Sequence, residues 1–157
     1  MFSPQEYDEL YPLACDWAQR QENAVLALGR KLSEKQAAIG QRVGIRDTAR
    51  VRVLAVTEIP KPEDEKLGAA IAKTNMITRA CRGIAIGYGV ILRADSWSDE
   101  ELLAHQLVHV AQYERAGGVA PFLDRYFRER LDGTGFGIGA LEQEARSVAA
   151  TMVAQRD

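Results

Sequence analysis

Cysteine, histidine and net charge are all scarce in this chain. Its 157 residues include two cysteines and two histidines, and 20 lysines and arginines are balanced by 22 aspartates and glutamates. Cys15 and Cys81 lie far apart and form no Cys-x-x-Cys pair, so we expect no disulfide framework and a reducing compartment. The lack of a basic excess argues against nucleic acid as a partner, because phosphate contacts depend on such an excess.

Long hydrophobic runs are also missing. The most apolar stretch, residues 83–92, is too short and too rich in glycine to cross a bilayer, and the chain opens with early acidic residues rather than a basic and apolar leader. We therefore expect a cytoplasmic protein with no membrane partner. With 46% hydrophobic and 27% charged residues, the composition is that of one globular domain over residues 1–157.

The first half of the chain predicts helix, then strand, then helix. Residues 5–43 carry apolar side chains at steps of three and four, as an amphipathic helix does, and Gly29 allows a division into two helices. We expect Pro12 to lie in an early turn or to break the first segment. The alternating, valine-rich residues 50–59 predict a strand, and residues 63–76 predict a short amphipathic helix.

The second half begins with another strand region and a helix with a clear start. Residues 83–93 are apolar, and the inner glycines Gly87 and Gly89 indicate a bulge or an edge. Ser98 and Glu101 have the spacing of a capping box. This pair predicts a helix that starts here and ends at the Gly-Gly pair some four turns later.

Two more helices are expected after that glycine pair, over residues 121–131 and from residue 140 to near the end of the chain. A glycine-rich loop at 132–139 separates them. We expect the aromatic residues of the first of these helices, Phe122, Tyr126 and Phe127, to belong to the core. Helices thus outnumber strands, and the strands form a small sheet, so the predicted fold class is α+β.

Both histidines of the chain, His105 and His109, lie in the helix that follows the capping box. Four residues are about one helical turn, so both imidazoles project from one face and can bind one ion. Neutral imidazole suits zinc, among other metals of intermediate softness. Leu103, Leu107 and Val110 form a separate apolar stripe on the same helix. The pattern predicts a metal site on a helix that packs against the core with another face.

The residues around this pair resemble a known family. The segment AHQLVHVAQY at 104–113, preceded by a predicted strand and followed by LEQEAR at 141–146, is similar to small zinc metallopeptidase domains of the gluzincin type. More narrowly, it resembles minigluzincin-like bacterial domains that combine HExxHxxQY with a downstream ExEAR segment. The likeness covers residues 85–150. It implies a helical zincin-like domain with a small β-sheet, zinc as cofactor, and a peptide or protein as substrate.

The resemblance also implies a third zinc ligand, a glutamate on a later helix, with water in the fourth position of an open site. Glu142 and Glu144 are the candidates. They are two residues apart, about 200° around a helix, so at most one of them can face the ion. Gluzincins often place alanine or glycine after the liganding glutamate. This preference favours Glu144, which is followed by Ala145, over Glu142.

The chain departs from the family at Gln106, which replaces the glutamate after the first histidine. In metallopeptidases that glutamate accepts a proton from the attacking water and delivers it to the leaving amine. An amide cannot accept this proton near neutral pH. We therefore expect a zinc-binding, metallopeptidase-like protein with impaired hydrolysis. Both a natural pseudoenzyme and an inactivating substitution are consistent with the sequence.

Tyr113 shares the face of the histidines and is the other candidate catalytic residue. A phenol with a pKa of about 10 is a poor base at neutral pH, so we expect Tyr113 to donate a hydrogen bond to an oxyanion. Three alternatives stay open at this point. One is an active metal-dependent hydrolase that uses another base, and another is a non-catalytic interaction domain in which zinc holds two helices together. The third is an α+β domain without a metal.

Overall fold

The computed structural model describes residues 3–74, 76–131 and 139–154. Helices dominate this part of the chain: α1 (Pro4–Leu28), α2 (Glu34–Arg42), α3 (Glu65–Thr74), α4 (Glu100–Ala116), α5 (Val119–Leu131) and α6 (Ala140–Ala154). The strands are short: β1 (Arg30–Lys31), β2 (Arg52–Val56), β3 (Gly83–Ile86) and β4 (Gly89–Arg93). The predicted α+β class is confirmed. Of the predicted glycine-rich loop, residues 132–138 lie outside the described residues.

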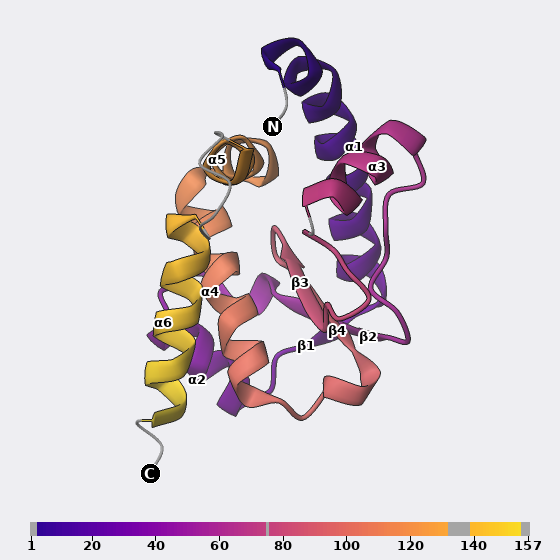
Figure 1. The fold of residues 1–157 in the computed structure, drawn as a ribbon. Helices are drawn as coiled ribbons and strands as arrows, with labels where there is room; N and C mark the ends of the chain where they lie inside the picture. Colours follow the sequence, from indigo (N-terminus) through magenta and orange to yellow (C-terminus); the bar gives the residue numbers. More distant parts are fainter. Residues whose placement is uncertain (1–2, 75, 132–138, 155–157) are drawn as a thin grey trace.

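The four strands form one mixed sheet in the order β1-β2-β4-β3. β2 and β4 run parallel at its centre, while β1 and β3 are antiparallel to their neighbours at the two edges. Figure 1 shows α4 and α6 side by side along one flank of the molecule, with α1 and α3 on the opposite side of the sheet region. Among the described residues, no helix is both long and apolar enough to cross a membrane.

Helix α4 is the most deeply buried helix of the fold. Its apolar stripe, Leu103, Leu107 and Val110, packs with Val53 of β2 and Val90 of β4 in one core cluster. The predicted division of this helix into a core stripe and a separate histidine face is confirmed. A second core cluster joins α1 and α5 to the end of β3 and to Tyr113.

The ends of α4 are defined by local chemistry. Asp99, not Ser98, is the N-cap, and its side chain accepts a hydrogen bond from the amide of Leu102. The predicted capping box is therefore wrong by one residue, since an aspartate carboxylate caps a helix as well as a serine hydroxyl does. Gly117 ends the helix with a φ of 101°, a left-handed conformation that favours glycine.

Three further expectations need correction. Residues 83–93 form a hairpin of two strands rather than one strand with a bulge, because Gly87, with a φ of 60°, reverses the chain between β3 and β4. The alternative prediction of an edge is confirmed, since β3 lies at the edge of the sheet. Pro12 lies inside α1 and does not break it. The predicted division of residues 5–43 into two helices is confirmed, but the short strand β1 between them was not predicted.

One carboxylate joins the end of α4 to two neighbouring segments. Glu114 accepts hydrogen bonds from the backbone amides of Arg46 (2.7 Å) and Asp47 (3.2 Å) and from the Tyr88 hydroxyl (2.7 Å). The Arg50 guanidinium lies 4.2 Å from the centre of the Tyr88 ring. Burial raises the pKa of Glu114, but the three hydrogen bonds outweigh it and leave the pKa below its ordinary value.

We predict that Glu114→Gln lowers the free energy of unfolding by about 1–3 kcal/mol at pH 7, because an ionised acceptor with three donors is lost. The pKa of Glu114 is lower in the folded than in the unfolded state. The stability that this ionised side chain contributes is therefore present above the unfolded pKa and is lost as the pH falls through the folded one.

Urea unfolding of both proteins between pH 7 and pH 3 measures this effect. The two stability curves should converge at the acidic end. The matched control is Glu58→Gln, which removes an exposed carboxylate and should change stability by less than about 0.5 kcal/mol. A constant difference between Glu114→Gln and wild type at every pH would contradict the assignment.

Candidate metal centre

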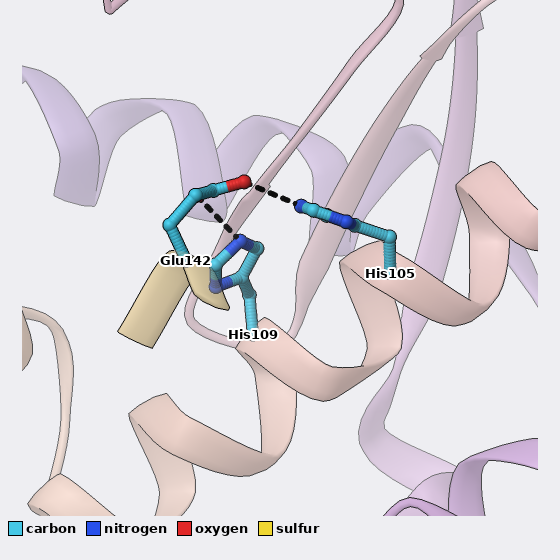
Figure 2. A group of neighbouring side chains, drawn as sticks. All are labelled: His105, His109 and Glu142. Atoms are coloured by element: carbon cyan, nitrogen blue, oxygen red, sulfur yellow. Dashed lines mark ion pairs between the residues drawn. The ribbon is translucent and has the colours of Figure 1, made fainter. Parts of the chain in front are cut away.

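Three side chains from two helices meet beside the core. His105 and His109 project from α4, and Glu142 reaches them from the first turn of α6 (Figure 2). The Nε2 atom of His105 lies 2.7 Å from Oε1 of Glu142, and the Nε2 atom of His109 lies 3.2 Å from Oε2. One ligand atom from each residue lies within 4.8 Å of the others, which is compact enough for a single metal ion.

The cluster is largely shielded from water. The side chains of His109 and Glu142 are 8% and 14% exposed, and that of His105 is 19% exposed. Burial raises the pKa of Glu142, but the hydrogen bonds and charges of the two imidazoles outweigh it and hold the pKa far below its ordinary value. Glu142 is therefore ionised at neutral pH and presents two carboxylate oxygens to the imidazoles.

The structure brings Glu142, and not Glu144, to the histidines. Glu144 points away, is 45% exposed at its side chain, and forms an ion pair of 2.8 Å with Arg115. The preference for Glu144 as third ligand therefore disagrees with the structure. The reason is the rotation of α6 about its axis, because Leu141, Ala145 and Ala149 face the core and leave the two glutamates on opposite sides.

Glu144 nevertheless contacts the cluster indirectly, through Gln112. The amide nitrogen of Gln112 donates to Oε1 of Glu144 (2.8 Å) and to the Leu141 carbonyl (2.9 Å). Its amide oxygen therefore faces His109 and accepts the Nδ1–H at 2.7 Å. This bond places a proton on Nδ1 of His109 and leaves Nε2, the ring nitrogen nearest Glu142, as the atom that would bind a metal ion, which is the arrangement that holds a histidine ligand in place.

The donor set fits zinc. Two imidazole nitrogens and one carboxylate oxygen are a ligand combination found in catalytic zinc sites, which keep one position open. The same combination also accepts other divalent metals of intermediate softness, so the geometry indicates a metal site rather than a particular metal. The predicted participation of His105 and His109 in one such cluster agrees with this arrangement.

A cavity of about 350 Å³ opens beside the cluster. His105, His109 and Glu142 line it, together with Gln106 and Tyr113. Gln106 is only 5% exposed, and it is one of the residues that border the cavity. The volume lies within the range of small-molecule sites, about 300–1,000 Å³.

Tyr113 is more enclosed than expected for a residue that contacts substrate. It is 4% exposed, and its ring stacks on Phe122 with 3.7 Å between ring centres. Burial raises the pKa of Tyr113 well above its ordinary value, so the phenol is protonated at neutral pH and can only act as a donor or neutral acceptor. Its role as an oxyanion donor stays a prediction.

The aromatic residues of α5 belong to the core, as predicted, and they also form a wall of the cavity. Phe122, Tyr126 and Phe127 line it from one side, and Trp17 of α1 lines it from another. The sequence signal was present but ambiguous, because buried aromatic side chains at helical spacing look the same whether the space beside them is filled or open. Cys81, which is partly buried, lines the cavity as well.

The chain was compared with protein-family models, curated proteins and solved structures, and none of them matches it. The resemblance to minigluzincin-like domains therefore rests on the motif residues themselves.

We predict that zinc raises the melting temperature of metal-stripped wild-type protein with one ion per chain. A ligand that binds only the folded state contributes about 2.7 kcal/mol when present at one hundred times its Kd. Glu142→Gln and His109→Ala should lose most of this rise, while Glu144→Gln should keep most of it with an affinity about tenfold weaker, as expected for an indirect contact.

Scanning calorimetry with and without zinc, together with competition against a chromophoric chelator, gives both quantities. Glu142→Gln and Glu144→Gln are a matched pair, since the substitution is the same and only the position differs. A larger loss for Glu144→Gln than for Glu142→Gln would return the third ligand to Glu144.

Proposed function

We propose that this protein binds one zinc ion through His105, His109 and Glu142, in a site with the architecture of a metallopeptidase centre whose hydrolytic step is impaired by Gln106. The observation that carries the proposal is the convergence of the three side chains beside a cavity that Gln106 also borders. The motif resemblance supports the proposal as well, because its histidine pair lies on the helix that carries the cluster. Under this proposal the substrate-like ligand is a peptide or protein.

A zinc ion bound there would supply Lewis acidity toward a carbonyl oxygen. The chain's own residues would orient the ligands and donate hydrogen bonds. Gln112 holds His109 in one orientation, and the surrounding side chains leave the two imidazoles and Glu142 largely buried. Tyr113 would offer a hydrogen bond as a protonated phenol.

The missing part is a group that takes a proton. Gln106 can orient a water molecule through its amide, but it cannot remove a proton from it near neutral pH. General acid–base catalysis contributes about 10²–10⁴-fold to rate, so hydrolysis should be slower by that factor than in a protein with glutamate here. Among the described lining residues, Glu142 is the only carboxylate, and it is a ligand in this proposal.

A second candidate is favoured by one observation. Glu142 belongs to α6 and both histidines belong to α4, so a metal ion at this cluster would join two helices. A protein that uses zinc only for this purpose would be a metal-stabilised interaction domain. The adjoining cavity favours the first candidate, because structural zinc sites are usually closed by a fourth protein ligand.

We predict that Gln106→Glu creates or raises zinc-dependent peptide hydrolysis by about 10²-fold or more. Glutamate and glutamine are nearly isosteric, so the fold and the three ligands should be retained, while the new carboxylate can accept a proton. The assay incubates denatured proteins and a peptide library with each variant and identifies cleavage by mass spectrometry, with and without chelator.

The control is Gln106→Glu/His105→Ala, which keeps the new carboxylate and removes one ligand. Cleavage by Gln106→Glu alone supports the proposal. If all variants bind zinc and none cleaves, the metal-stabilised interaction domain becomes the better description. Equal zinc-dependent cleavage by wild type and Gln106→Glu would mean that another residue acts as base.

A further inference from the structure

We propose that the cavity of the zinc-loaded protein binds carboxylates that carry an apolar, aromatic body, and that Gln106 makes this binding possible. The inference rests on the proposed function, since it assigns a class of ligand to the same site. It follows from the shape of the cavity, from the charges on its wall, and from the hydrogen-bonding state of Gln106.

The cavity has a chamber lined mostly by apolar side chains. Trp17, Ile77, Ile86, Phe122 and Phe127 are among the residues that form the chamber. These walls come from α1, the segment before β3, the end of β3, and α5, so they belong to separate parts of the fold that enclose one space. Such a chamber gains binding free energy from a ligand with an apolar ring, because both surfaces leave water.

The charged groups of the cavity favour an anion once the metal is bound. Glu142 and Arg146 are the only charged side chains among the described lining residues other than the histidines. They lie one turn apart on α6, and Arg146 has no ion-pair partner within the described part of the chain. The charges of Glu142 and Arg146 offset each other, so a divalent ion gives the lining of the cavity a net positive charge.

Gln106 is a polar side chain on the cavity wall with no hydrogen-bond partner among the described residues. It is 5% exposed, borders the cavity, and has no side-chain hydrogen bond to any described residue. Its amide nitrogen lies close to Gly83 of β3, where an added Cβ would come within 3.3 Å of it. An amide that borders the cavity and has no partner in the described part of the chain is available to donate a hydrogen bond to a ligand oxygen.

The identity of residue 106 then decides which ligands the site retains. A glutamate at this position would place a negative charge on the wall of the cavity, and this charge would repel a carboxylate ligand. Glutamine has nearly the same shape, but it is neutral and can donate a hydrogen bond to a carboxylate oxygen. The substitution that impairs proton transfer therefore turns the site into one that holds a carboxylate, which is the group that peptide hydrolysis releases.

The test uses calorimetric titration of the full chain with 4-phenylbutyrate, butyrate and 4-phenylbutyramide. Zinc stoichiometry is measured first in the same preparation by chelator competition. We expect zinc-loaded wild-type protein to bind 4-phenylbutyrate about tenfold or more tightly than butyrate, because the ring enters the chamber. It should also bind the acid about tenfold or more tightly than the neutral amide, and removal of zinc should abolish this difference.

Two variants test the residues. Gln106→Glu should weaken 4-phenylbutyrate binding about tenfold or more and leave 4-phenylbutyramide binding nearly unchanged, since only the acid meets the new charge. Arg146→Gln should weaken binding of the acid alone, whereas its matched control Arg20→Gln, on the exposed surface of α1 and outside the cavity lining, should not.

The possible outcomes separate the two proposals. If zinc does not bind, the proposed function fails and this inference fails with it. If zinc binds with one ion per chain but wild type does not distinguish 4-phenylbutyrate from butyrate or from the amide, the inference alone is overturned. Equal loss of both aromatic ligands in Gln106→Glu would show a change of cavity shape and would also overturn the role given to Gln106.

Discussion

The contact between the Glu142 carboxylate and the two imidazoles of α4 is the interaction on which the rest of the site depends. It requires α6 to lie along α4 at close range, with the start of α6 level with the middle of α4. Small side chains make the close approach possible, since Ala145 and Ala149 of α6 are both fully buried. The Gln112 bridge between His109 and the start of α6 follows from this placement of two helices.

The burial of α4 explains why this placement is precise. One side of the helix packs on the sheet through its leucines and valine, and its last full turn is joined to two other segments by Glu114. The histidine face therefore has little freedom to rotate. Rigid support of this kind is what a metal site needs, because ligand atoms must be held within fractions of an ångström.

Several features of the site could be predicted from the sequence, and the reasons are local. The i, i+4 spacing of His105 and His109 places both rings on one face of a helix, whatever the rest of the chain does. The apolar stripe on another face predicted which side of α4 enters the core. The fold class followed from the balance of helical and strand patterns, and even the glycines that interrupt residues 83–93 indicated an irregularity, although a turn rather than a bulge.

The choice between Glu142 and Glu144 could not be made in the same way. Both flank the buried stripe of α6, and the side that meets α4 depends on which way the helix is turned in three dimensions. The cavity was equally hidden, since its walls come from segments far apart in the chain. Tertiary placement, and not local pattern, determines both properties.

The buried stripe of α6 has a consequence for the recognition of related chains. The number of residues between the histidine pair and α6 has little physical importance, because a connecting segment can lengthen at small cost in entropy. The position of Glu142 relative to the stripe is different, since a shift by a single residue would turn the carboxylate about 100° away from the imidazoles. A search for distant relatives should therefore allow any number of residues between the histidine pair and the helix that carries the glutamate. It should require that the glutamate directly follows one buried residue of that helix and precedes the next by three positions, as Glu142 does between Leu141 and Ala145.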